Sequence, residues 1–269
     1  MDTLIVPLAD MQSGGTTALF PNDNKKFKHG WYVPNDDQLE MFEHFEKCAK
    51  IIKKARKGKK LIIVGMGEAI DGVHHNTPQL VTTLVDEQID IHVELVEHFK
   101  NLVGFDGRKD KTYYISSTES HTADHEETCA KKVKAQENPK GLYVYDELKK
   151  NVNGAWLWFS HHGPSAGKGP NKGNSQRNFL RDIYVECTNN ELVPPDMVVT
   201  AHRHTPFYNI YIQEKKAGWH LLHGLICPSW QQKTRYAYKV ASLQLNKVGL
   251  AYFTVLDSGD ILKPRILIM

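Results

Sequence analysis

Two histidines one residue apart, His202 and His204, follow an apolar segment that begins at Val198, and Pro206 prevents further regular strand pairing. In an extended segment, residues i and i+2 point to the same side, so both imidazoles can face one small object. Imidazole nitrogen is a common metal ligand. Such a pair also arises without function in a chain with 14 histidines. The other ligand-type residues must decide between these two interpretations.

Four other apolar segments also end in residues whose side chains bind metals. Their ends are Asp10-Met11-Gln12, Glu68-Ala69-Ile70-Asp71, Thr118-Glu119-Ser120-His121 and His161-His162. If all five segments are strands that end at one edge of a sheet, these side chains can form a metal site together. Histidine, carboxylate and amide ligands without cysteine suit manganese, iron, zinc or nickel, and we expect manganese first.

Such a ligand set suits two metal ions, which need a bridging anion such as a carboxylate at a strand end. A pair of ions clamps a phosphoryl group, activates water and stabilises the leaving oxygen. No Gly-x-Ser-x-Gly motif indicates a serine nucleophile instead. A mononuclear oxygenase with two histidines and one carboxylate is a second enzyme class, but it would leave Glu68, His121 and His161 without a role.

Hydrophobic periodicity predicts strands and helices that alternate through most of the chain. The clearest helix covers residues 35–56, with apolar residues alternately four and three apart. Further helices are expected over residues 77–101, with Pro78 in the first turn, and over 123–136 and 175–188. Strands are expected over residues 3–9, 60–67, 112–116, 142–145 and 155–159, with a polar turn at 151–154, and then at the His202 segment. The remaining segments, 207–212, 219–226, 235–245, 249–256 and 261–268, are expected to be nearly all strand.

This order of elements predicts an α/β fold in a single domain over residues 1–269. Because strands and helices alternate early while the end is nearly all strand, two packed sheets with helices outside are favoured over one doubly wound sheet.

Composition and charge are those of an ordinary globular protein, with 41% hydrophobic and 24% charged residues. The net charge of +3 is too small to argue for nucleic acid by itself. No apolar run is long enough to span a bilayer. Four cysteines without Cys-x-x-Cys spacing, and an N-terminus without a signal-like segment, predict a cytoplasmic protein with reduced thiols and no membrane association.

The five blocks resemble, in their order, the calcineurin-like metallophosphoesterase family. That family has the pattern DxH, GDxxD, GNH[DE], a lone histidine at a strand end, and GHxH. The corresponding stretches here are Asp10-Met11-Gln12, 67–71, 117–121, His161-His162 and 201–204. The final HxH block and the order of the blocks are the specific part of the resemblance. It implies a four-layer αββα sandwich of two mixed sheets flanked by helices.

The resemblance also implies roles for individual residues. One metal ion would be held by Asp10, Gln12 and His204, and the second by His161, His202 and a group near Thr118, with Glu68 between the two ions. His121 corresponds to the histidine that contacts phosphate and protonates the leaving group. Asp71 would orient a ligand histidine.

Four positions depart from the family pattern. Gln12 replaces a histidine, Glu68 is one methylene longer than the usual aspartate, and Ala201 replaces a glycine. The block at 117–121 is two residues longer than GNH, so either Thr118 or Glu119 supplies its ligand. His162 is expected not to be a ligand, because neighbours in an extended chain point in opposite directions and His161 directly follows the apolar segment.

Three residues are candidates for substrate contact. Residues 163–174 form a loop rich in glycine and lysine that follows the histidine pair, so Lys168 and Lys172 could close over a phosphate. His74 could line the same cleft or simply lead into the next helix.

The expected function is metal-dependent hydrolysis of a phosphodiester or phosphomonoester, in a nucleotide or nucleic acid, by metal-activated water at a dinuclear centre. Two alternatives stay open. A non-catalytic scaffold of the same fold would bind proteins, and a DNA exonuclease would act with a partner ATPase. The sequence does not indicate an oligomeric state.

Overall fold

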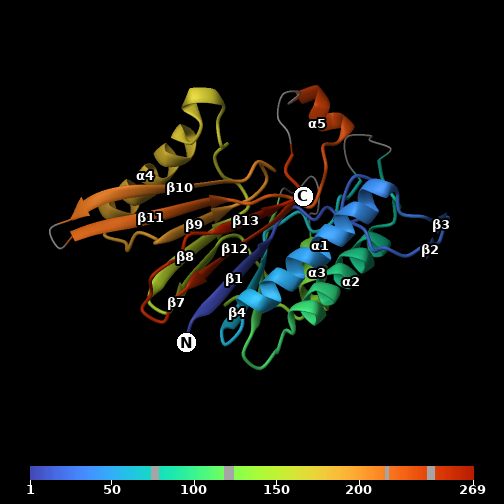
Figure 1. The fold of residues 1–269 in the computed structure, drawn as a ribbon, viewed down its shortest axis with the longest axis horizontal. Helices are drawn as coiled ribbons and strands as arrows, with labels where there is room; N and C mark the ends of the chain where they lie inside the picture. The colour runs from blue at the N-terminus through green and yellow to red at the C-terminus, as the bar shows by residue number, and fades with distance from the viewer. Residues whose placement is uncertain (74–78, 118–123, 216–217, 241–245) are drawn as a thin grey trace.

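The structure is a computed structural model that describes residues 1–73, 79–117, 124–215, 218–240 and 246–269. In these residues the chain forms a mixed α/β fold with three sheets and five α-helices (Figure 1). The smallest sheet is a hairpin of β2 (Lys25–Phe27) and β3 (Gly30–Tyr32), in a region expected to be irregular. The two large sheets carry the candidate site.

The larger sheet has six strands, four of them parallel. In order across the sheet they are β13 (Arg265–Ile268), β12 (Gly249–Val255), β1 (Thr3–Leu8), β4 (Lys60–Gly65), β5 (Lys111–Ile115) and β6 (Val144–Tyr145). The strands β1 and β4 are parallel neighbours, and Leu8 pairs with Gly65. Their carboxyl ends therefore lie side by side, which brings Asp10 and Glu68 to one edge of the sheet.

The second large sheet has five strands. In order they are β10 (Phe207–Lys215), β11 (Gly218–Ile226), β9 (Met197–Thr200), β8 (Ala155–Ser160) and β7 (Leu148–Val152). The central strands β8 and β9 are parallel, and Ser160 pairs with Thr200. The segments that begin at His161 and at Ala201 therefore leave the sheet next to each other.

The two large sheets pack face to face through a buried apolar cluster. Ile5 and Val64 of the six-stranded sheet lie in this cluster with Phe159 and Val199 of the five-stranded sheet. Each of these side chains is at most 1% exposed. This burial fixes the carboxyl ends of both sets of parallel strands relative to each other.

Helices pack on both large sheets. α1 (Asp36–Ala55), α2 (Val85–Val103) and α3 (His125–Lys132) pack on the six-stranded sheet, while α4 (Asn174–Asn189) packs on β10 and β11 (Figure 1). Asn35 caps α1 in a reciprocal arrangement with Gln38. Among the described helices, none is long and apolar enough to cross a membrane.

The start of α2 differs from the expected position. The helix begins at Val85, and the described residues 79–84, expected to be helical, are not. In their place Val81 donates its backbone hydrogen bond to Gly14 at 2.7 Å, and Leu80 forms a bridge with Gly15. Pairing with the loop after β1 therefore outweighs the local helix signal of Pro78, which itself lies outside the described residues.

Two further expectations near the C-terminal half were wrong. Residues 235–240, expected as strand, form the short helix α5 (Arg235–Val240). Residues 148–152 form β7, which pairs with β8 through a tight turn at Asn153 and Gly154. Both turn residues have positive φ, of 53° and 97°, as an Asn-Gly hairpin turn requires. The turn lies within the expected segment 151–154, but residues 151 and 152 belong to β7, and this strand was missed.

A buried ion pair joins the end of α1 to the loop before β5. Arg56 lies 2.7 Å from Asp110 and also donates to the carbonyl of Gly104 at 2.7 Å. Asp110 is 1% exposed and accepts from the backbone of Leu61 at 2.9 Å. Both charges are thus desolvated and depend on each other.

We therefore expect Asp110→Ala to lower the free energy of unfolding by about 3–5 kcal/mol, because it leaves the Arg56 charge buried without its partner. Urea unfolding followed by circular dichroism measures this loss. The exposed pair of Arg108 and Asp106 is the control, and Arg108→Met should leave the urea midpoint unchanged. Equal midpoints for Asp110→Ala and the wild type would contradict the prediction.

Candidate metal centre

The backbone at the candidate site is unusual. Asp10, Gln12, Glu68, His202 and His204 have φ of 47°, 42°, 51°, 64° and 50°. They are five of the eight non-glycine residues with positive φ in the described part of the chain. Each such residue costs roughly 1–3 kcal/mol, and strain of this kind concentrates at functional sites. The strained positions coincide with the ligand residues expected from the sequence.

Asp10 connects the two sheets at this edge. Both of its carboxylate oxygens accept from the backbone nitrogen of His202, at 3.2 and 3.1 Å. One of them also lies 3.7 Å from Nε2 of His204. Because the side chain of Asp10 is fully buried, its charge needs these partners or a cation.

Glu68 lies at the centre of the site. Its Oε1 is 3.2 Å from Nε2 of His161 and 3.4 Å from Nδ1 of His202. Its Oε2 accepts a short hydrogen bond from Nε2 of Gln12. Both carboxylate oxygens of this 2%-exposed residue thus face other candidate ligands, which is the geometry that a bridging carboxylate requires.

The surroundings of His161 define which nitrogen keeps its proton when the ring is neutral. Its Nδ1 lies 2.7 Å from the carbonyl oxygen of Met66, which can only accept, so Nδ1 carries a proton and Nε2 points to Glu68. The close approach depends on Gly67, where a Cβ would lie 2.6 Å from the ring. A backbone carbonyl behind the ring is the usual second partner of a metal-binding histidine.

The electrostatics of the cluster favour a cation. Burial by itself lowers the pKa of His161, but the hydrogen bond to Glu68 and the charges of Asp10 and Glu68 outweigh it and raise that pKa to about 9. For His204 too, burial lowers the pKa, and the charge of Asp10 raises it overall. In the metal-free protein at neutral pH, His161 therefore carries a proton where a metal ion would bind.

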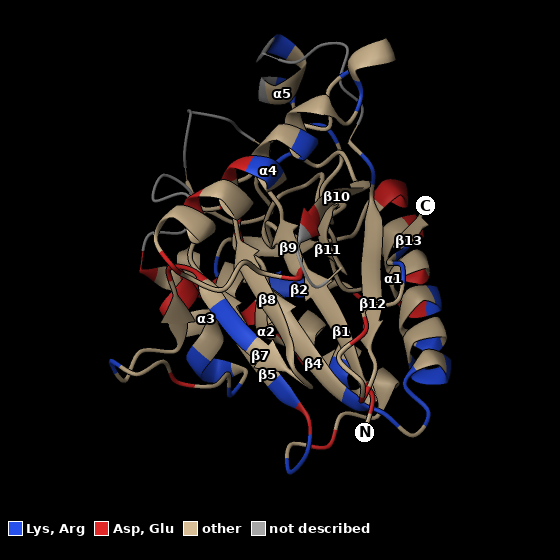
Figure 2. Cartoon of the chain, turned by 90° about the vertical axis from the view of Figure 1, so that its left-hand side faces the viewer, with Lys and Arg blue, Asp and Glu red and all other residues tan. Residues whose placement is uncertain are grey.

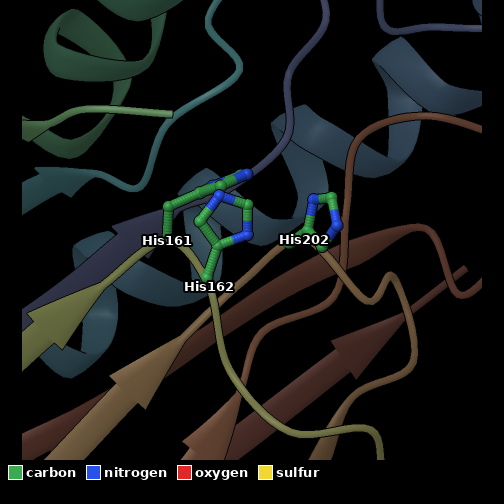
Figure 3. A group of neighbouring side chains, drawn as sticks. All are labelled: His161, His162 and His202. Atoms are coloured by element: carbon green, nitrogen blue, oxygen red, sulfur yellow. The ribbon is translucent and has the colours of Figure 1, made fainter. Parts of the chain in front are cut away.

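Three histidine rings lie together on the side of the five-stranded sheet. Their centroids are 4.9 Å apart for His161 and His162, 5.1 Å for His161 and His202, and 4.8 Å for His162 and His202 (Figure 3). One nitrogen of each ring lies within 4.8 Å of the others, so this group can hold a metal ion.

The structure therefore differs from two expectations based on strand alternation. β8 ends at Ser160, so the alternation does not extend to His161 and His162, and both rings join one group. β9 ends at Thr200, and the two later histidines join different groups. His202 lies with the histidines, whereas His204 lies with the carboxylates.

Asp10, Glu68 and His204 form the second group, and their ligand atoms again lie within 4.8 Å of one another. Glu68 belongs to this group and also lies within 3.4 Å of two rings of the other group. Oε1 of Gln12 is buried and has no hydrogen-bond partner among the described residues. A buried acceptor of this kind costs free energy unless a cation or donor satisfies it. The donor atoms present fit divalent metal ions.

Two residues near the site were missed from the sequence. Nδ2 of Asn246 lies 2.9 Å from Nδ1 of His204, so this amide orients the ring. Glu126 in the first turn of α3 accepts from the backbone nitrogen of Ala69 at 2.9 Å. Burial raises the pKa of Glu126 to about 7. Glu126 lies inside an expected helix, and Asn246 directly follows the segment 235–245 that was expected to be strand but was not considered as a site residue, so the tertiary structure was needed to reveal both.

The remaining residues that were assigned to the site from the sequence either lie outside the described residues or have roles that the described contacts do not test. Thr118, His121 and His74 lie outside the described residues. The carboxylate of Asp71 packs against Gly15, where a Cβ would lie only 2.8 Å from Oδ2, and its proposed role toward a histidine stays a prediction. Lys168 and Lys172 are exposed on the loop after β8, and substrate contact by them also stays a prediction.

Neither a model of a known protein family nor a curated protein matches this sequence. Any assignment of function therefore depends on the geometry of the site and on the sequence motifs.

Metal binding to this cluster should release protons. Because His161 has a pKa of about 9 without metal, it is protonated at neutral pH and must lose its proton to become a ligand. We expect about one proton released at pH 7 when the ion held by His161 binds, and an apparent affinity for that ion that rises about tenfold per pH unit up to pH 9. Calorimetry in buffers of different ionisation enthalpy measures this release. Equal affinity at neutral and alkaline pH would contradict it.

Proposed function

We propose that the chain is a metal-dependent phosphoesterase that resembles the calcineurin-like metallophosphoesterases, with a four-layer αββα sandwich in one domain over residues 1–269. The observation that carries the proposal is the pair of three-residue ligand groups, {Asp10, Glu68, His204} and {His161, His162, His202}, with Glu68 in contact with both. A cytoplasmic location is part of the proposal.

The first ion would be held by Asp10, Gln12 and His204, and the second by His161, His162 and His202, with Glu68 shared. When bound, the two ions would supply Lewis acidity toward phosphate and would make a water more acidic. Oε1 of Gln12 is the ligand atom in this scheme, because its Nε2 already donates to Glu68. Manganese is favoured, with iron, zinc or nickel as alternatives.

The protein's own groups have three tasks in the reaction. The carboxylates of Asp10 and Glu68 concentrate negative charge at a buried edge, which only cations can balance. Met66 and Asn246 hold the rings of His161 and His204 in orientation. His121 stays our candidate for protonating the leaving oxygen.

A direct test is hydrolysis of bis-p-nitrophenyl phosphate and p-nitrophenyl phosphate with added Mn²⁺. We expect His202→Ala to lower the rate roughly a hundredfold or more, since loss of one ligand disturbs the ion and its bound phosphate. The control is His98→Ala, because His98 lies on the surface of α2 and pairs with Glu46. This variant should keep wild-type activity.

The same hydrolysis assay, together with the metal content, also distinguishes the phosphoesterase from the non-catalytic scaffold. Absence of hydrolysis by the folded wild type with manganese, iron, zinc and nickel would count against the enzyme. If metal content after purification were also substoichiometric, the non-catalytic scaffold would be favoured.

A further inference from the structure

Basic residues are distributed unevenly around the candidate metal centre. Residues 162–181, 201–213 and 228–248 contain nine lysines and arginines and no aspartate or glutamate. The whole chain, in contrast, has 34 basic and 31 acidic residues. All three segments begin at or near strand ends of the five-stranded sheet. Figure 2 shows basic residues of α5 and of the start of α4 at the same end of the molecule.

One part of this surface is a hollow beside the first turns of α4. It has a volume of about 360 Å³ and is lined by Asn174, Arg177, Asn178 and Arg181 of α4 and by Tyr211 of β10. None of the described residues that line it is a carboxylate, although Arg181 also donates to Asp182, the next residue, at 2.8 Å. The two arginines are one helical turn apart, about 6 Å along the axis, so both can reach one run of anionic groups.

The hollow is linked to the segment that leaves the metal centre through strand β10. Phe207, where β10 begins, is three residues after His204. Nζ of Lys172 lies 5.3 Å from the centroid of the Phe207 ring. Asn209 donates to the carbonyl of Gly173 at 3.2 Å, immediately before α4 begins. These contacts join the loop that carries Lys172, and the start of α4, to the strand that follows His204.

The kinds of side chain in the hollow indicate the ligand. Arginines bind phosphates in a bidentate way, and amides such as those of Asn174 and Asn178 bind phosphate and base edges. The partly exposed ring of Tyr211 offers a stacking surface. Positive groups along a groove together with an aromatic ring are typical of surfaces that bind single-stranded nucleic acid.

We propose, building on the phosphoesterase function above, that the α4–β10 surface binds the backbone of a single-stranded nucleic acid. This surface consists of Lys172, Asn174, Arg177, Asn178, Arg181 and Tyr211. The bound strand continues past Phe207, so that one of its phosphodiesters lies at the metal centre. The substrate class is therefore an extended strand.

The test measures binding in the absence of metal, so that it does not depend on hydrolysis. A fluorescein-labelled single-stranded oligonucleotide of about 15 nucleotides is titrated with the protein in EDTA, by anisotropy, over a range of NaCl concentrations. The wild type is compared with Arg177→Gln/Arg181→Gln. The matched control is Lys53→Gln/Lys54→Gln, which removes the same charge from a second basic surface at the end of α1.

We expect Arg177→Gln/Arg181→Gln to reduce the slope of log affinity against log salt by about 1.4, because each phosphate contact to a single strand contributes about 0.7. The affinity should fall roughly 25-fold at about 0.1 M salt, while the Lys53→Gln/Lys54→Gln control keeps the wild-type slope and affinity.

Three results would overturn the proposal: no binding by the wild type, an equal loss in both double variants, or binding of anionic vesicles that depends on Arg177 and Arg181 without oligonucleotide binding. If oligonucleotide binding behaves as expected but neither p-nitrophenyl ester is hydrolysed, the phosphoesterase proposal fails and the binding surface stands.

Discussion

Glu68→Gln is expected to abolish both metal binding and phosphoester hydrolysis. The side chain of Glu68 lies between candidate ligands of both ions, with His161 and His202 on one side and Gln12 on the other. The amide keeps the shape of the side chain but removes the charge that would bind both ions. Loss of several kcal/mol of charge stabilisation corresponds to a rate lower by roughly a thousandfold or more.

The same substitution has a readout that requires no metal. The hydrogen bond and charge of Glu68 raise the pKa of His161 to about 9, so Glu68→Gln should lower it toward the ordinary histidine value. NMR titration of the metal-free protein follows the His161 ring. Because the pKa is raised in the folded state, His161 stabilises the metal-free protein most below its unfolded pKa, and this contribution is lost as the pH rises through about 9.

Glu68→Asp is the matched control. It keeps the charge and introduces the residue that is usual in the family that the sequence resembles. We expect it to retain metal and part of the activity. Full metal content and full activity in Glu68→Gln would show that Glu68 does not bridge the two ions.

His162→Ala is expected to remove one of two bound metal ions. The ring of His162 lies within 5 Å of the centroids of both His161 and His202, and without it that group offers two ligands from the described residues. Ion affinity should fall roughly 10- to 100-fold or more, and metal analysis after dialysis should give about half of the wild-type content. The rate of phosphoester hydrolysis should fall together with the metal content.

Thr118→Ala is the informative companion variant, because the resemblance assigns the third ligand of the second ion to the region of Thr118. If His162 is the ligand, Thr118→Ala keeps its metal while His162→Ala does not. The opposite pattern would restore the ligand set expected from the sequence and would leave His162 as a neighbour only.

Local patterns in the sequence determined several parts of this protein. The spacing of apolar residues identified α1 to within a residue at each end. The apolar segments before Asp10, Glu68 and His161 are the strands β1, β4 and β8. These features depend on residues close in the chain, where side-chain period and capping act directly.

Where the local pattern predicted the wrong conformation, either a contact with residues distant in the sequence or the end of a strand determined the structure. Residues 79–84 pair with the loop at Gly14 instead of extending α2. His162 joins the site although alternation along a strand predicts the opposite face, because β8 ends at Ser160. Local propensities are worth a few tenths of a kcal/mol per residue, and tertiary contacts can exceed them.

The sequence by itself determined which residue types end the strands and in what order, and hence that a metal centre was to be expected. Only the tertiary structure decided how those residues are grouped. The parallel pairings of β1 with β4 and of β8 with β9, and the packing of the two sheets, place Glu68 between Gln12 and His161. These contacts join residues more than fifty positions apart, and no local periodicity carries that information.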